Sequence, residues 1–217
     1  MVAAKEKLGH LLVLVAERRW TQLSCELADL ILNWPENGAE AMRGAMLALF
    51  ETALREADDQ TRSHLAPRFA GRTDIPLKIL NLLYLAAAAP MRREILLRNA
   101  LEQGEIAGVP PADGALILSA ARNGARDFLS AFSVGAGVPR RIAQAVLSDA
   151  SGEALAVLCC GRGLDRATFS AIALLKGPRG MPLAVFDSVP PKAALHLVED
   201  WRRLTNAALP SQVQAAE

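Results

Sequence analysis

The sequence predicts an all-α fold, either an α-solenoid or an irregular bundle of about ten to twelve short helices. Of its 217 residues, 40 are alanine and 34 are leucine, two strong helix formers. Valine, isoleucine and threonine, which favour strands, total only 26, and aromatic residues make up 5%. This composition argues against a β-sandwich or barrel, and the apolar content of 52% excludes global disorder.

Residues 1–58 are predicted to form N-terminal helices that pack on the rest of the chain. One apolar stripe at helical spacing ends at Pro35, and it consists of Trp20, Leu23, Leu27, Leu30, Ile31 and Trp34. A second helix is predicted over residues 37–57, with a stripe made of Met42, Ala45, Met46, Leu49, Phe50, Ala53 and Leu54. The apolar run over residues 8–15 is either a separate first helix or part of the next one.

Residues 59–176 alternate between short apolar segments and breaks at proline, glycine or aspartate. The segments pair into helix-turn-helix units that begin near residues 59, 90, 125 and 151. Two helices with one apolar stripe each cannot cover both stripes by themselves, so neighbouring pairs are expected to stack. A closed globular bundle of the same helices is the alternative.

The rest of the chain is predicted to hold a loop and one more helix. Residues 177–209 open with the least helical stretch and continue into a helix that carries Leu195, Val198, Trp201 and Leu204. The end of the chain, 210–217, is predicted to be a frayed tail.

Charge and cysteine content favour a cytoplasmic protein that does not contact the membrane. The 24 basic and 23 acidic residues give a net charge of +1, which removes bulk charge as an argument for a nucleic-acid partner. No apolar run approaches the roughly 18 residues of a membrane span, and the run after Lys7 is too short for a signal peptide. Three cysteines do not make a disulfide framework.

Four segments carry a resemblance to a known family: Thr61–Ala70 (TRSHLAPRFA), Asp74–Leu80 (DIPLKIL), Met91–Asn99 (MRREILLRN) and Gly137–Leu158. Over residues 17–176 the chain resembles an uncharacterised bacterial family of HEAT-like helical proteins, a domain of unknown function. The resemblance implies a HEAT-like arrangement of the helical pairs in 59–176 and no established activity. Pro67 departs from the family, because it stands where a helix-interior residue is expected.

No pattern in the sequence indicates catalysis. His10, His64 and His196 lie far apart and lack further ligands at the spacing of a metal site. Cys159 and Cys160 are adjacent, so one of the two thiols is expected in the core. Nucleophile-elbow and phosphate-loop motifs are absent from the sequence. We therefore expect a protein that is not an enzyme, binds no metal and needs no cofactor.

Arginine is the non-random feature among the charged residues. Nineteen of the 24 basic residues are arginine, and many stand in local pairs. Equivalent positions of stacked units line one face, so a row of arginines there could hold carboxylates or phosphates. The candidates for such a row are Arg93, Arg126, Arg141 and Arg166. The alternative is that each arginine is paired separately on a solvated surface.

These patterns predict a non-catalytic helical scaffold or adaptor that binds a protein partner through a concave or arginine-lined helical face. Trp20, Trp34 or Trp201 would add exposed aromatic contacts. The alternative is a nucleic-acid-binding HEAT-like protein with a C-terminal basic groove, because residues 122–217 hold 11 basic and 8 acidic residues. A third class is an enzyme whose site is assembled from separate helices, and a homodimer is compatible with each role.

Overall fold

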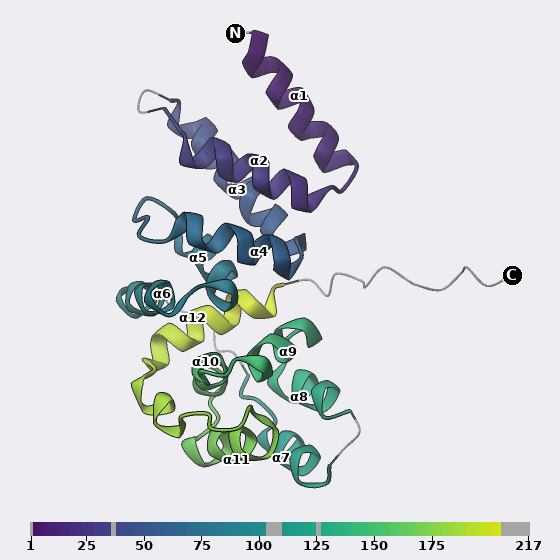
Figure 1. Ribbon diagram of the computed structural model, residues 1–217, viewed down its shortest axis with the longest axis vertical. Helices are drawn as coiled ribbons and strands as arrows, with labels where there is room; N and C mark the ends of the chain where they lie inside the picture. The colour runs from purple at the N-terminus through teal and green to yellow at the C-terminus, as the bar shows by residue number, and fades with distance from the viewer. Residues whose placement is uncertain (1, 36–37, 103–109, 125–126, 205–217) are drawn as a thin grey trace, which may run out of the picture.

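The structure, a computed structural model, describes residues 2–35, 38–102, 110–124 and 127–204, with side chains from Lys7 onward. Within these residues the chain forms twelve α-helices and three short 3-10 helices and contains no strand. The all-α prediction is therefore confirmed. The helices form an elongated stack, with α1 at one end and α7 and α11 at the other (Figure 1).

The N-terminal half is built from six α-helices that follow one another along the stack. They are α1 (Val2–Ala16), α2 (Trp20–Leu32), α3 (Glu40–Glu56), α4 (Asp59–Leu65), α5 (Leu77–Leu83) and α6 (Ala89–Leu101), with the 3-10 helices η1 (Ala66–Phe69) and η2 (Tyr84–Ala86). Helix α2 packs on α3, α3 on α5, and α5 on α6. Each helix thus covers the apolar stripe of a neighbour, as expected for stacked pairs.

The C-terminal half surrounds one largely buried helix. Its elements are α7 (Gly114–Arg122), α8 (Phe128–Ala136), α9 (Arg140–Ser148), α10 (Glu153–Gly161), α11 (Arg166–Lys176), η3 (Leu183–Ser188) and α12 (Pro191–Arg202). Every residue from Ala154 to Cys159 is buried, because α9, α11, α12 and η3 all pack on α10. A helix that is apolar all round occupies the centre of a domain.

Proline and aspartate set several of the helix boundaries. Helix α4 ends at Leu65 and the chain continues as a 3-10 turn through Pro67, since proline has no N–H for an α-helical hydrogen bond. Aspartate side chains accept a backbone N–H at the start of four helices, and these caps are Asp58, Asp113, Asp127 and Asp165. Residues 205–217, which include the predicted frayed tail, lie outside the described residues.

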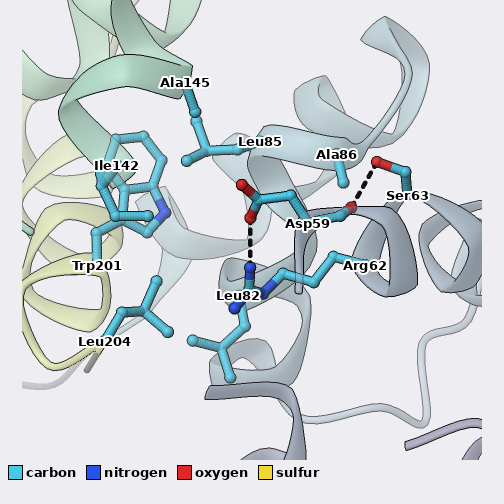
Figure 2. A pocket seen from close by; sticks show the side chains of 10 residues that line it. All are labelled: Asp59, Arg62, Ser63, Leu82, Leu85, Ala86, Ile142, Ala145, Trp201 and Leu204. Atoms are coloured by element: carbon cyan, nitrogen blue, oxygen red, sulfur yellow. Dashed lines mark hydrogen bonds and ion pairs between the residues drawn. The ribbon is translucent and has the colours of Figure 1, made fainter. Parts of the chain in front are cut away.

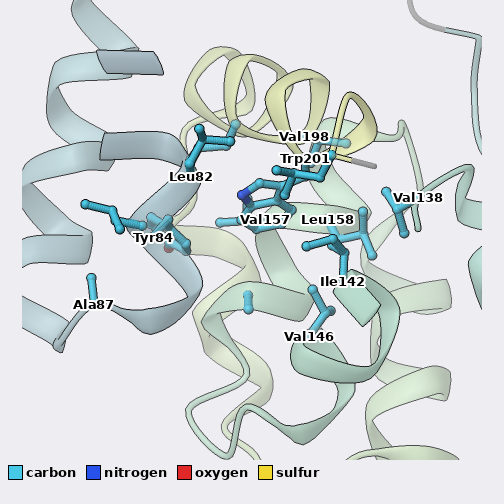
Figure 3. Close-up of a cluster of buried hydrophobic side chains, with 14 of the residues drawn as sticks. Leu82, Tyr84, Ala87, Val138, Ile142, Val146, Val157, Leu158, Val198 and Trp201 are labelled. Carbon is cyan, nitrogen blue, oxygen red and sulfur yellow. The ribbon is translucent and has the colours of Figure 1, made fainter. Parts of the chain in front are cut away.

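Helix α12 does not continue the stack in chain order. It lies between α6 and α10 and packs on α5 and α6 as well as on α10 (Figure 1). Figure 3 shows side chains of α12 in one cluster with those of both halves: Val198 and Trp201 of α12, Leu82 and Tyr84 of the N-terminal half, and Val157 and Leu158 of α10. Helix α12 therefore joins the two halves through a continuous core.

The prediction that Trp201 offers an exposed aromatic contact is wrong, because this side chain is only 1% exposed. The centroid of its ring system lies 5.7 Å from that of Tyr84, and its Nε1 donates to the carbonyl of Asn81 at 3.2 Å. Trp20 and Trp34 are half-buried. Trp201, the largest fully buried side chain of the described residues, thus holds α12 in place.

A buried polar network also joins α12 to α5 and α6 and makes their docking more specific. The amide of Asn81 on α5 donates to the carboxylate of Asp200 on α12 at 2.8 Å, and it also exchanges two hydrogen bonds with the amide of Asn99 on α6. Burial raises the pKa of Asp200, and the bond from Asn81 opposes this rise. A buried network of this kind is satisfied only when the three helices are docked together.

The contact between α10 and α12 leaves no room for a side chain at Gly161. A Cβ atom there would lie 2.5 Å from the carbonyl oxygen of Ala194 on α12. We expect Gly161→Ala to lower the free energy of unfolding by about 2 kcal/mol, because α12 must shift its backbone. Urea unfolding measures this loss.

Gly44→Ala is the matched control, since a Cβ on exposed Gly44 of α3 meets no atom within 4 Å. That variant should gain about 1 kcal/mol from helix propensity, whereas equal stability of the two variants would contradict the prediction.

Candidate functional site

The arginines predicted to line one face lie in different environments. Arg93 is exposed on α6, and it makes no ion pair or hydrogen bond with any residue that the structure describes. Arg141 on α9 is half-buried and donates to a backbone carbonyl of α3 at 2.7 Å. Arg166 on α11 is exposed and pairs with Asp187 at 2.9 Å. Arg126 lies outside the described residues. Of the three described arginines, Arg93 is thus the one whose guanidinium is available to a partner.

Arg93 borders a groove of about 440 Å³ at the junction of the two halves. The groove, called the α6 groove below, is lined by Ala89, Arg93, Leu96 and Leu97 of α6, by Ser151 and Glu153 at the start of α10, and by Val185, Ser188 and Pro190. Leu97 is 59% exposed and Leu101 is 81% exposed. Because Leu101 follows Leu97 by one helical turn, the apolar surface continues along α6 beyond the groove.

A cluster of charged side chains lies behind the groove. Arg92 on α6 forms an ion pair with Asp149 at 2.9 Å and lies 3.9 Å from the carboxylate of Glu153. The hydroxyl of buried Tyr84 lies beside Glu153 without the geometry of a normal hydrogen bond. Burial raises the pKa of Glu153, and the positive charges of Arg92 and, more weakly, Arg93 oppose the rise.

Arg92 also fixes the backbone that frames the groove. Its guanidinium donates to the carbonyls of Tyr84 and Ala87 through Nε, at 3.1 and 2.9 Å, and to that of Leu85 through Nη2, at 2.9 Å. These carbonyls lie along η2 and at its end, and that of Tyr84 also accepts the backbone N–H of Ala87. Arg92 therefore serves the structure, while Arg93, the next residue, faces the groove.

Neither Arg92 nor Glu153 was predicted from the sequence to be part of this site. The arginine pair at 92 and 93 was visible, but the sequence alone does not say which of two adjacent arginines is buried. The signal for Glu153 was its place in the first turn of a predicted helix, where an acidic residue is ordinary.

A second, smaller pocket lies at the other end of α12. It has a volume of about 100 Å³ and is lined mainly by apolar side chains of four elements: Leu82, Leu85, Ala86, Ile142, Ala145, Trp201 and Leu204, with Asp59, Arg62 and Ser63. Figure 2 shows the ion pair of Asp59 and Arg62 on one side of this pocket and Trp201 and Ile142 on the other. The pocket is well below the range of about 300–1,000 Å³ typical of ligand sites.

Two arginines next to this pocket stabilise the end of α3. Arg62 donates to the carbonyls of Leu54 and Ala57 at 3.1 and 2.5 Å, and Arg141 donates to that of Arg55 at 2.7 Å. Burial and the nearby charge of Arg141 lower the pKa of Arg62 to about 10, so Arg62 remains charged at neutral pH. Arg141, a predicted partner-binding residue, is thus already engaged with the protein's own backbone.

The described part of the chain contains no group of three or more His, Cys, Asp or Glu side chains that could hold a metal ion. Cys159 is fully buried and Cys160 is half-buried, and burial raises the pKa of both thiols. None of the helices formed by the described residues has the length and apolar character needed to cross a bilayer.

Residues 111–208 match a family described as "Uncharacterised protein conserved in bacteria (DUF2336)". The match begins before α7 and runs through α12, so it covers the C-terminal half and overlaps the resemblance over 17–176 in residues 111–176. No curated protein and no solved structure matches the chain. The description of this family names no activity.

Proposed function

We propose that this protein is a non-catalytic helical scaffold, or adaptor, that binds a protein partner through the α6 groove. The observation that carries the proposal is the exposed, unpaired Arg93 beside the exposed apolar side chains of Leu97 and Leu101. An apolar surface with a polar rim is typical of protein interfaces, and arginine often contributes strongly to binding there.

The groove favours a particular kind of partner segment. Apolar side chains of the partner would pack on Leu96, Leu97 and Val185, and a carboxylate would bind Arg93. Arg92 and its ion pair with Asp149 keep the groove wall in place, so the surface is largely formed before the partner arrives. A preformed surface loses less conformational entropy on binding.

We favour a protein partner over nucleic acid because most described arginines are already engaged. Arg62, Arg92 and Arg98 each donate to several backbone carbonyls. A duplex would require a continuous row of free cations. We further propose that the helical pairs are HEAT-like and that the protein acts in the cytoplasm, where its three free thiols would remain reduced.

Site-specific photo-crosslinking tests the proposal. A photoreactive amino acid at Leu97, in the cells of the source organism, should capture the partner, whereas the same group at Leu174 of α11 should not. With the captured protein purified, Arg93→Glu should raise the dissociation constant by about 10–100-fold, because the charge that contacts the partner in an apolar interface is reversed.

Arg19→Glu is the matched control, since Arg19 is also an exposed arginine but pairs with Glu17 in the turn between α1 and α2, where no residue lines the groove. Its affinity should stay within about twofold of the original. Equal binding by the Arg93→Glu variant, or equal crosslinking from Leu97 and Leu174, would contradict the docking surface. DNA binding that weakens with added salt would favour the nucleic-acid alternative instead.

A further inference from the structure

Arg162 differs from the other buried arginine of the described chain. It directly follows α10 and is 5% exposed, yet its Nε and Nη1 atoms are buried and have no hydrogen-bond partner. Arg62 is equally buried, but its guanidinium donates to three backbone carbonyls and to Asp59. Donors on a buried cation are rarely left unpaired, because the lost hydration is not replaced.

The remaining nitrogen of Arg162 faces a second guanidinium across a glycine. A Cβ atom placed on Gly137 would lie 3.1 Å from Nη2 of Arg162 and 3.9 Å from Nε of Arg202. Gly137 is exposed and has a φ of 64°, in the left-handed region that favours glycine. Nε of Arg202 donates to the carbonyl of Gly137 at 3.3 Å, so the two guanidiniums meet at this exposed glycine, where no side chain stands between them.

Three arginines and two carboxylates lie in this region, and one of the carboxylates, Asp200, lies 3.9 Å from Arg203. Arg162, Arg202 and Arg203 lie near Glu199, whose carboxylate accepts hydrogen bonds from Arg202 at 3.0 Å and from Arg203 at 3.1 Å. Glu199 makes no ion pair with Arg162. Burial and, less strongly, the charge of Arg202 lower the pKa of Arg162, and the negative charge of Glu199 opposes this shift.

We propose that Arg162 and Arg202 bind a small oxyanion, inorganic phosphate or a phosphomonoester, beside Gly137. A phosphate group offers several acceptor oxygens to two convergent guanidiniums. A single carboxylate has only two oxygens and serves two guanidiniums less well. Because Gly137 carries no side chain, Nη2 of Arg162 is left uncovered on this side, where a Cβ would lie only 3.1 Å from it. The site is independent of the α6 groove, since Arg162 follows the end of α10 and the groove lies at the start of α10.

Binding to the full-length chain tests this site. Equilibrium dialysis with radiolabelled inorganic phosphate, at constant pH and ionic strength, should show a single equivalent bound to the chain. Arg162→Met and Arg202→Met should each weaken that binding by about tenfold or more, because charge-assisted hydrogen bonds are removed. Arg166→Met, which alters an exposed arginine on α11, should bind phosphate as the original chain does.

Thermal unfolding gives a second readout that separates binding from stability. Phosphate should raise the midpoint of unfolding more than chloride at matched ionic strength, and the difference should vanish in the Arg162→Met variant. In chloride alone that variant should be at least as stable as the original chain, since an unpaired buried charge has been removed. Comparing phosphate with chloride within each variant keeps the two effects apart.

The outcomes are distinguishable. No phosphate bound by the original chain, or equal binding by the Arg162→Met variant, overturns the proposal. Binding of O-phosphoserine more tightly than inorganic phosphate supports it and identifies a phosphomonoester as the ligand, and the reverse order supports it and identifies free phosphate. Failure of phosphate binding leaves the Arg93 crosslinking experiment unaffected, because the two sites share no residue.

Discussion

Replacement of Trp201 by alanine is expected to lower the free energy of unfolding by about 3–5 kcal/mol, the usual loss for a large buried aromatic side chain. Trp201 is 1% exposed, contacts the ring of Tyr84 and donates a hydrogen bond to the carbonyl of Asn81. Truncation removes this packing and leaves the Asn81 carbonyl without that donor. Guanidinium or urea unfolding measures the loss directly.

The position of α12 makes the effect of this substitution long-range. Because α12 packs on α5, α6 and α10, loosening it should expose backbone amides in segments far apart in sequence. Hydrogen exchange should therefore speed up in residues 77–83 and 153–161 of the Trp201→Ala variant. Helix α2, which packs on α1, α3 and α4, should keep its protection.

Two further variants make the prediction specific. Trp201→Phe keeps an aromatic ring but loses the Nε1 donor, so it should cost about 1–2 kcal/mol. Trp20→Ala removes a half-buried indole at the start of α2 and should leave exchange in α10 unchanged. A loss below about 1 kcal/mol for Trp201→Ala, or faster exchange confined to α12, would show that α12 does not couple the two halves.

Helix positions were largely predictable because their signals are local. Pro90 falls in the first turn of α6, and Pro139 immediately precedes α9, where its missing N–H costs nothing. Gly137 ends α8 in the left-handed conformation that glycine adopts easily. The helix predicted over 37–57 runs over Glu40–Glu56. Such signals depend only on the chain within a few residues of each boundary.

The place of α12 could not be predicted in the same way. Its apolar stripe, which includes Val198 and Trp201, shows that one face is buried but not which helix covers it. The covering residues lie far away in the chain: Asn81 contacts Asp200 across 119 positions. Polar residues such as Asn81 and Asn99 also give no sign of burial in the sequence, because asparagine is usually exposed.

The arginine row was only partly predictable for a related reason. Successive residues on a helix are separated by about 100° around its axis, so Arg92 and Arg93 must face different surroundings. Composition and pairing showed that arginine was important but not which member of each pair meets a carbonyl, a carboxylate or solvent. That choice depends on which helix ends lie nearby, such as the end of η2 that Arg92 stabilises.

The same reasoning predicts a large effect at Arg62. We expect Arg62→Met to lower the free energy of unfolding by about 3 kcal/mol or more, because several acceptors at the end of α3 lose a buried, charged donor. The affected carbonyls are those of Leu54 and Ala57, together with the weaker contact to Arg55 at 3.4 Å. Urea unfolding at pH 7 measures the loss, since Arg62, with a pKa of about 10, is charged there.

Arg141 determines how much of this loss is recovered. It already donates to the carbonyl of Arg55 and repels Arg62, so removing Arg62 relieves a repulsion and leaves one of the three carbonyls paired. The carbonyls of Leu54 and Ala57 have no such substitute among the hydrogen bonds of the described residues. A double-mutant cycle with Arg141→Met should therefore show coupling between the two arginines rather than additivity.

Arg68→Met is the matched control for Arg62→Met. Arg68 lies on η1 and forms an ion pair with Asp29 at the surface, so its removal should cost at most about 1 kcal/mol. Arg62→Lys should recover only part of the stability, because an ammonium group cannot reach carbonyls in several directions as a planar guanidinium does. Equal stability of the Arg62→Met and Arg68→Met variants would mean that the end of α3 does not depend on Arg62. In that case Arg62 would be buried because the helices pack around it, and it would not itself stabilise their packing.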